Sequence, residues 1–247
     1  MSLLSSFLLG IIQGLAEFLP ISSSGHLAVA QNLLHFSAAG ADATAFTVLL
    51  HLGTLAAVIV AYWHDIVEMV REFFRAISDL IRHRSSVHTP PARRLLLLII
   101  VGTLPLFLIL PFKDRIEALS ANMWFIGFAF LFTGVLLFLS DRVRRGRKTE
   151  KTATLRDTLI VGAAQAIATC PGISRSGMTI CAGTFLGFDR RFAVRFSFLL
   201  SLPAVIGANL LELKDLAASG GLAASAVPAC LVGIVTAGVV GYLSLRL

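Results

Sequence analysis

Long apolar runs dominate the chain, and short polar or charged segments separate them. About 20 apolar residues suffice to cross a hydrocarbon core of about 30 Å. Five unbroken runs come close to this length or exceed it, at residues 44–63, 95–112, 122–140, 196–213 and 221–245. The pattern therefore predicts an all-α polytopic membrane protein with five full spans, folded as a single membrane domain over residues 1–247.

Two further apolar runs, residues 3–36 and 159–188, are broken in the middle by polar residues. Pro20 and a run of serines interrupt the first, and Pro171-Gly172 with a second serine loop interrupts the other. Such a break is tolerated at membrane depth only where protein or a wet cavity lines it. Each run is therefore predicted as a re-entrant hairpin of helix, loop and helix.

Charged and apolar residues alternate over residues 65–84, a spacing typical of an amphipathic helix on a membrane surface. This helix would serve either as a simple membrane anchor or as a dock for a lipid headgroup. Residues 113–121 are predicted as a short turn between two spans.

Composition agrees with a membrane protein, because 56% of the 247 residues are hydrophobic and only 14% are charged. A soluble domain would carry about a quarter charged residues. The net charge of +7 could suggest a nucleic-acid partner. However, the basic residues lie beside apolar spans, which is the pattern of membrane orientation. No nucleic acid is therefore expected as a partner.

The basic residues also predict the orientation of the spans. Residues 63–94 carry six Lys or Arg and residues 142–156 carry seven, whereas the opposite side receives only Lys113, Arg115 and Lys214. This arrangement obeys the positive-inside rule only if both broken runs return to the side from which they entered. The first hairpin then enters from outside, the second enters from the cytoplasm, and the basic loop 141–155 is cytoplasmic.

An internal repeat relates the two broken runs. With an offset of 152 residues, seven of sixteen positions are identical. They are Gly10, Gln13, Ala16, Ile21, Ser22, Ser24 and Gly25, matching Gly162, Gln165, Ala168, Ile173, Ser174, Ser176 and Gly177. Since the hairpins enter from opposite sides, residues 1–140 and 156–247 are predicted to form an inverted-topology repeat, a design that binds ligands near the midplane. A counterpart of span 122–140 is expected to be absent from the second half.

Each broken run offers an anion site, because the first N–H groups of a helix lack intrahelical partners and attract phosphate. The candidate phosphate-binding residues lie in the two loops and are Ser22, Ser24, Gly25, Ser174, Ser176 and Gly177. The alternative for any single serine is an ordinary N-cap.

Glu17 and Arg175 are the charges farthest from any span boundary. They form either a structural ion pair or part of a site, and the planar donors of Arg175 suit a phosphate oxyanion. Gln13 and Glu17 are four residues apart on one helical face, so they could hold a divalent cation such as Mg²⁺ or Ca²⁺, or orient a nucleophile. No organic cofactor is expected.

Ser23 and His26 are three residues apart, a spacing that permits a nucleophile and its base. His51 is the only ionisable group in its span, and it is either a packed histidine or a member of the site.

Two motifs at these positions resemble those of the undecaprenyl-diphosphate phosphatase family, the bacitracin-resistance type of integral membrane phosphatase. The first comprises Gln13, Glu17, Phe18, Leu19, Pro20, Ser22, Ser23, Ser24, Gly25 and His26. The second, of the form PGxSRSxxT, comprises Pro171, Gly172, Ser174, Arg175, Ser176 and Thr179. Some members have Glu where this chain has Gln13, which disfavours a two-carboxylate metal site here.

The resemblance implies hydrolysis of undecaprenyl diphosphate to the monophosphate, which recycles the lipid carrier of peptidoglycan synthesis and confers bacitracin resistance. It further implies a bacterial plasma (inner) membrane location and an active site that opens to the outer, periplasmic face. By motif, Glu17, Ser23, His26 and Arg175 would be catalytic, and Thr179 would join the phosphate-binding residues.

Two mechanisms and a second function stay open. Either Ser23 attacks the terminal phosphorus, or a metal-activated water does so while Ser23 binds the substrate. The alternative function is a transporter that flips polyprenyl phosphates, because inverted repeats with broken helices are typical of transporters. The expected partners are the polyprenyl diphosphate substrate and membrane lipids, with a homodimer as one option for assembly.

Overall fold

The computed structural model describes residues 2–33, 41–82, 89–218 and 224–247, which are almost entirely helical. Four stretches of helix are long and apolar enough to cross a membrane, and a fifth candidate joins α3 to α4 across an 81° bend. The four are Pro91–Ile116, Met123–Asp141, Arg190–Leu211 and Ala224–Arg246. These findings confirm the prediction of an all-α, multi-pass membrane protein.

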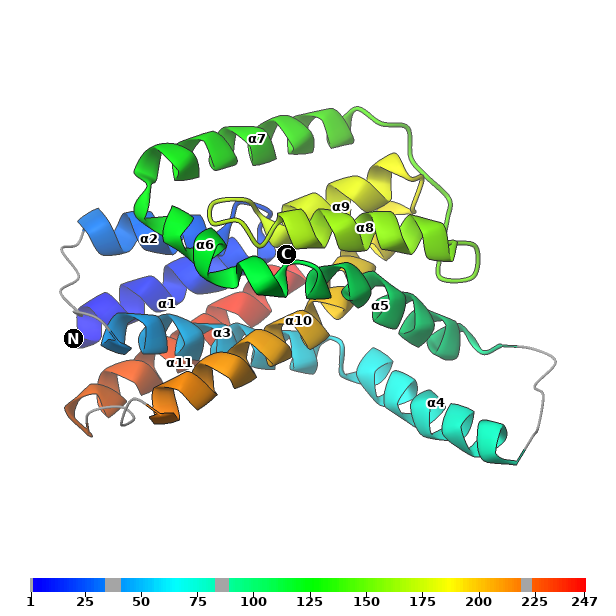
Figure 1. The fold of residues 1–247 in the computed structure, drawn as a ribbon, viewed down its shortest axis with the longest axis horizontal. Helices are drawn as coiled ribbons and strands as arrows, with labels where there is room; N and C mark the ends of the chain where they lie inside the picture. Colours follow the sequence, from blue (N-terminus) through cyan, green and yellow to red (C-terminus); the bar gives the residue numbers. More distant parts are fainter. Residues whose placement is uncertain (1, 34–40, 83–88, 219–223) are drawn as a thin grey trace.

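Each broken run forms a pair of short helices (Figure 1). The first pair is α1 (Leu3–Phe18) and α2 (Ser23–Leu33), and the second is α8 (Leu155–Ile167) and α9 (Arg175–Phe185). Their lengths of 16, 11, 13 and 11 residues fall short of the roughly 20 needed to cross a bilayer. In Figure 1, α1 and α8 run inward from opposite ends of the molecule, and their loops meet near its centre.

The two hairpins pack in a reciprocal way. Helix α1 packs against α11 (Val227–Arg246), and α8 packs against α5 (Pro91–Phe107). A Cβ atom added to Gly10 would lie 2.8 Å from the Gly233 carbonyl oxygen, and one added to its repeat equivalent, Gly162, would lie 2.3 Å from that of Gly102. The glycines shared by the repeat therefore let the first helix of each hairpin approach a span of the other half closely.

Helices α3 (Ala41–Ala61) and α10 (Arg190–Ala218) pack against each other in the centre of the molecule. The repeat-related pairs Phe46 with Phe196 and Leu50 with Leu200 are at most 1% exposed. Helix α10 is longer than the predicted span, because it begins at Arg190 and ends at Ala218.

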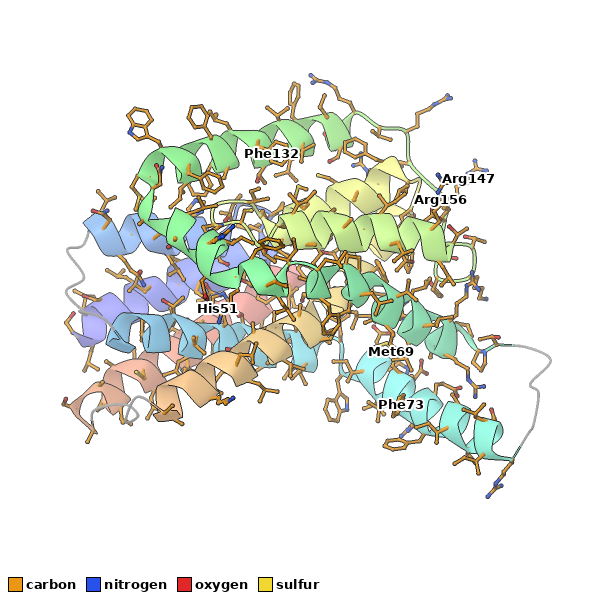
Figure 2. All side chains as sticks on the ribbon, viewed as in Figure 1. His51, Met69, Phe73, Phe132, Arg147 and Arg156 are labelled. Carbon is orange, nitrogen blue, oxygen red and sulfur yellow. The ribbon has the colours of Figure 1, made fainter. Side chains whose placement is uncertain are left out.

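The predicted amphipathic helix is α4 (Trp63–Ile81), which leaves the bundle after the bend (Figure 1). Figure 2 places Met69 between α4 and α5, whereas Phe73 lies on the exposed side of α4. Glu72 faces α5 and accepts a hydrogen bond from Arg93 Nε at 3.1 Å. One face of α4 is thus fixed to α5, and an apolar face is left uncovered.

Residues 113–121 are not a turn, as the sequence had predicted, but contain the short helix α6 (Lys113–Ala118) and the 3₁₀ turn Leu119–Ala121. The hexapeptide KDRIEA consists mostly of good helix formers, with Asp114 in its first turn. Helix α5 ends at Phe107, earlier than predicted, because Pro111 lacks the N–H that a continuing helix would use.

The basic loop between the halves is pinned to the turn that follows α9. Lys148 N–H donates to the Gly187 carbonyl oxygen at 3.0 Å, and Asp189 N–H donates to that of Lys148 at 2.8 Å. Arg147 and Arg156 lie at this same end of the molecule (Figure 2). The loop thus closes one end of the second hairpin.

Candidate active site

The two loops meet through Glu17, in the last turn of α1, and Arg175, the first residue of α9. The Arg175 Nη2 group donates to Glu17 Oε1, and the Glu17 side chain is only 10% exposed. The Arg175 side chain is 27% exposed and lines a pocket beside this pair. The structure therefore brings together the two charges that the sequence marked as unusual.

Ser23 completes this contact from the start of α2. Its Oγ donates to Glu17 Oε2 at 2.6 Å, which lies within the range for proton transfer to a general base. Gln13 Nε2 donates to the same carboxylate oxygen at 3.1 Å. One carboxylate is thus held by an amide, a hydroxyl and a guanidinium, and Gln13 orients Glu17.

His26 does not pair with Ser23 in the way that their spacing permitted. Its Nδ1 lies 2.8 Å from the Ser22 carbonyl oxygen, so this nitrogen must carry the proton and Nε2 is left as an acceptor. The ring lies against Phe130 of α7 (Met123–Asp141), with centroids 4.8 Å apart. In this structure the group in contact with the Ser23 hydroxyl is Glu17, because the Ser22 carbonyl fixes His26 one turn away.

His51 fits both interpretations that the sequence left open. Its Nδ1 donates to the Thr47 carbonyl oxygen at 2.8 Å, as a packed histidine does. Its Nε2 lies 3.9 Å from Glu17 Oε2, at the edge of the site.

Ser22 and Ser174 are buried and act as helix caps. Ser22 Oγ accepts from Gly25 N–H at 3.4 Å, and Ser174 Oγ accepts from Gly177 N–H at 3.1 Å. The N-cap alternative therefore describes these two serines in this structure. Gly25 and Gly177 supply the N–H groups that the caps use.

The other phosphate-binding candidates differ in how free they are. Ser24 is exposed, whereas Ser176 Oγ reaches the Glu17 carbonyl oxygen at 3.4 Å. Thr179 is 2% exposed, and its hydroxyl is shared with Ser197 at 2.5 Å and with the Arg175 carbonyl oxygen at 2.9 Å. Thr179 therefore supports the first turn of α9 rather than facing a ligand directly.

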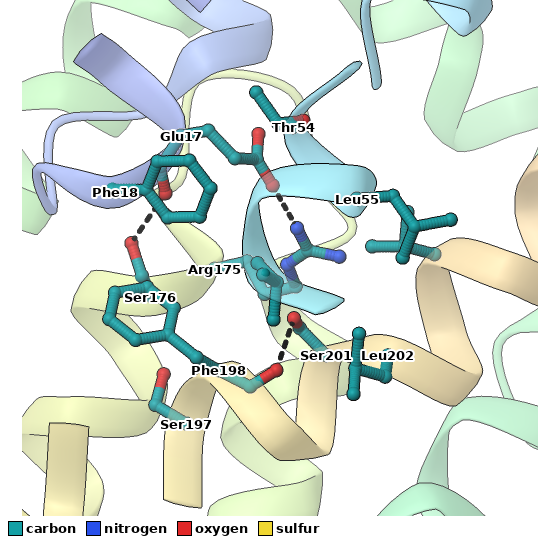
Figure 3. Close-up of a pocket in the computed structure, with 12 residues that line it drawn as sticks. Glu17, Phe18, Thr54, Leu55, Arg175, Ser176, Ser197, Phe198, Ser201 and Leu202 are labelled. Atoms are coloured by element: carbon teal, nitrogen blue, oxygen red, sulfur yellow. Dashed lines mark hydrogen bonds and ion pairs between the residues drawn. The ribbon is translucent and has the colours of Figure 1, made fainter. Parts of the chain in front are cut away.

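A small pocket opens beside the Glu17–Arg175 pair, between α3 and α10 (Figure 3). Three hydroxyl residues in its wall, Thr54, Ser197 and Ser201, were not selected from the sequence. Single hydroxyls in apolar spans look like ordinary core residues. The repeat offered a signal, since Ser197 and Ser201 align with Thr47 and His51 at an offset of 150 residues.

A resident divalent cation does not fit these residues. The described part of the chain holds no group of three His, Cys, Asp or Glu side chains placed to share an ion. Glu17 is the single carboxylate of the site, and an ion bound to it would lie beside the Arg175 guanidinium, which repels a cation.

Comparison with known proteins gives one consistent family. The family model described as "Bacitracin resistance protein BacA" matches residues 6–247. An undecaprenyl-diphosphatase from Methanosphaera stadtmanae is 42% identical over 252 residues, which cover 100% of this chain and 88% of that protein. An undecaprenyl-diphosphatase from Alkaliphilus metalliredigens is 44% identical over 217 residues, covering 87% and 78% respectively. The resemblance carried by the two loop motifs is thereby confirmed, and the chain belongs to the bacitracin resistance protein BacA family.

Proposed function

We propose that this protein is an undecaprenyl-diphosphatase, which hydrolyses undecaprenyl diphosphate to undecaprenyl phosphate and inorganic phosphate. The observation that carries the proposal is the shared carboxylate of Glu17, which accepts from Ser23 at 2.6 Å and pairs with Arg175. Glu17 thus contacts both a nucleophile, Ser23, and a cation that can bind the phosphate oxygens, Arg175. The names of the relatives point to the same reaction.

In the first step, Ser23 Oγ attacks the terminal phosphorus while Glu17 accepts the hydroxyl proton. The new bond forms between Oγ and phosphorus, and the bond from phosphorus to the bridging oxygen breaks. The electron pair leaves with undecaprenyl phosphate. Glu17 suits this role because its Oε2 already accepts the Ser23 hydrogen bond.

Charge on the transferring phosphoryl group needs donors around it. Arg175 supplies a planar set of N–H groups, and the first turns of α2 and α9 supply backbone N–H groups. His26 would use Nε2 to accept a proton from water, since Nδ1–H is held by the Ser22 carbonyl.

In the second step, water attacks the phosphoserine, inorganic phosphate leaves, and the proton held by Glu17 returns to Ser23. The rival mechanism uses water in a single step and leaves Ser23 as a binding group. Trapping a phosphate on Ser23 after acid quench, followed by mass spectrometry, separates the two mechanisms.

We place the protein in the plasma membrane, with the site open to the outer face. Support comes from the basic segments, since the loop with Arg147 and Arg156 lies at one end of the second hairpin and belongs in the cytoplasm by the positive-inside rule. Labelling of single cysteines in this loop by an impermeant reagent tests the orientation.

The role of a divalent cation is a separate proposal. Since the residues of the site do not fit a resident ion, we propose that any cation arrives bound to the diphosphate, whose oxygens are good Mg²⁺ ligands. A homodimer is likewise a proposal, and mass photometry in native nanodiscs tests it. Activity would not depend on a second copy, because Glu17, Ser23 and Arg175 come from one chain.

In the decisive experiment, the purified protein is placed in lipid vesicles and supplied with C55 diphosphate. Released phosphate is measured with and without a chelator. We expect release that Ser23→Ala abolishes and that Ser225→Ala, an exposed serine in the 3₁₀ turn Ala224–Ala226, leaves almost unchanged. Transfer of lipid across the vesicle membrane without phosphate release would overturn the proposal in favour of the transporter.

A further inference from the structure

Helix α7 connects the two hairpins. It lies across both hairpins and packs against α2 of the first and α9 of the second (Figure 1). Its buried residues recur on one face, at Ile126, Ala129, Thr133 and Ser140. The opposite face is exposed, with Leu131 at 67% and Val135 at 56%. A single helix thus touches both halves of the candidate active site.

On the first hairpin, α7 contacts the residues around His26. The Phe130 ring lies 4.8 Å from the His26 ring, at an interplanar angle of 39°. A Cβ atom added to Gly25 would come within 2.4 Å of the same Phe130 ring. Phe130 therefore packs directly on the turn that carries Ser23 and His26, and Gly25 leaves the room for it.

On the second hairpin, α7 contacts the loop that leads to Arg175. Ser174 N–H donates to Thr133 Oγ1 at 3.2 Å, in a fully buried hydrogen bond. Ala129 lies against Gly172, where an added Cβ atom would be only 2.8 Å from the Ala129 methyl group. Thr133 thereby holds the N-cap of α9, one residue before the catalytic arginine.

We propose that Phe130 and Thr133 are positioning residues, which hold the His26 turn and the Arg175 loop in register from one rigid helix. The two side chains lie three residues apart on α7, so a fixed spacing on the helix sets the spacing of the two loops. The inference rests on the proposed function, because register between the loops places Ser23 and Arg175 around one phosphate.

The first test separates the ring of Phe130 from its bulk. Phe130→Leu keeps an apolar side chain but loses the flat surface against His26, and we expect kcat to fall about tenfold with KM almost unchanged. Phe130→Tyr keeps the ring and should return most of the activity. Phe132→Leu is the matched control, since Phe132 lies two residues on and is 45% exposed.

Equal kcat values for Phe130→Leu and Phe132→Leu would overturn the role of Phe130. Thermal unfolding of each variant in detergent checks that it folds. If Phe130→Leu does not fold, Phe130→Met takes its place, because Met is flexible enough to fill the gap without a ring.

A second readout does not depend on catalysis. Diethyl pyrocarbonate modifies accessible imidazoles, and mass spectrometry measures the modification at His26 with His51 as the internal reference. We expect Phe130→Leu to raise the relative rate at His26 at least threefold and Phe132→Leu to leave it unchanged. Equal rates would reject the inference, whereas an inactive parent protein with this difference intact would reject only the proposed function.

The second loop has its own pair of variants. Thr133→Val removes the acceptor for Ser174 N–H at nearly constant volume, and Thr133→Ser restores it. We expect kcat to fall about fivefold to tenfold in the first and to recover in the second. Thr103→Val is the control, since the Thr103 hydroxyl donates to the Ile99 carbonyl oxygen of its own helix. No difference between Thr133→Val and Thr103→Val would refute the role of Thr133.

Discussion

The tips of the two hairpins share one backbone plan but carry different chemistry. In each tip a serine caps the second helix through a glycine N–H, Ser22 with Gly25 and Ser174 with Gly177. The positions between and around the caps differ, because the first tip has Ser23 where the second has Arg175. The repeat thus supplies the scaffold twice, and each copy contributes a different group to one site.

The difference extends to the residues that surround the loops. Glu17 corresponds to Thr169, whose hydroxyl donates to the Ala166 carbonyl oxygen of its own hairpin at 2.8 Å. His26 corresponds to Met178, which is buried in an apolar cluster. The groups suited to proton transfer are therefore concentrated in the first hairpin, and the second contributes the cation that balances charge.

The largest effect is expected from Ser23→Ala, which removes the nucleophile from the first tip. If Ser23 forms a covalent intermediate, kcat should fall by about 10⁴-fold or more, as it does when a nucleophile is deleted from other hydrolases. The exposed variant Ser225→Ala is the control and should stay within about threefold. Phosphate release under single-turnover conditions measures both. A loss of only about tenfold in Ser23→Ala would favour direct attack by water.

The next effect comes from the second tip. Arg175→Ala should lower kcat by about 10³-fold, because it removes the donors to the phosphoryl oxygens. It also leaves the buried Glu17 carboxylate without the arginine that balances its charge, which should cost about 3 kcal/mol of unfolding free energy. Arg175→Lys keeps the charge but loses the planar fork, so it should be more stable than Arg175→Ala yet still impaired. Thermal unfolding and phosphate release are measured for the parent protein, Arg175→Ala and Arg175→Lys. Equal unfolding temperatures and equal rates in all three would refute this role of Arg175.

Much of this arrangement could be predicted from the sequence. Hydropathy gave the spans, because apolar length is directly tied to bilayer thickness. The repeat and the depth of Glu17 and Arg175 in apolar runs indicated that the two loops meet. The physical reason for the second of these signals is that a charge deep in the membrane needs a partner.

The rest depends on contacts that leave no mark on a single sequence. Phe130 and Thr133 are ordinary residues of an apolar span, and only the position of α7 across both tips gives them partners. The spacing of Ser23 and His26 suggested a pair, but a helical turn fixes the spacing of two residues and not the partner of each hydrogen bond. His26 Nδ1 donates to the Ser22 carbonyl oxygen instead.

A smaller effect should separate the two capping serines. Among the described residues, Ser22 is the only non-glycine residue with a positive φ, at 74°, whereas Ser174 has φ −74°. Glycine adopts the left-handed region without strain, so Ser22→Gly should be unchanged or up to about 1 kcal/mol more stable. Ser174→Gly should lose about 1 kcal/mol through greater chain entropy and a lost cap.

The same variants test whether Ser22 binds phosphate through its hydroxyl. If Ser22 acts only through its backbone and cap, Ser22→Gly keeps most of the kcat, and Ser22→Ala is the less stable variant because alanine keeps the strain. A large loss of activity in a stable Ser22→Gly protein would restore the hydroxyl as a phosphate ligand.

The smallest effect concerns the two glutamines that the repeat shares. Gln13 donates to Glu17, whereas both amide atoms of Gln165 are buried and have no hydrogen-bond partner among the described residues. Leucine has a similar volume without the amide, so Gln165→Leu should raise the unfolding free energy by about 1 kcal/mol, since an unsatisfied buried polar group is costly. Gln13→Leu should instead lower kcat severalfold, because Glu17 loses the donor that orients it towards Ser23. Equal effects of the two variants on activity would show that the repeat-related glutamines have the same role, and a less stable Gln165→Leu protein would show that its amide is satisfied in solution.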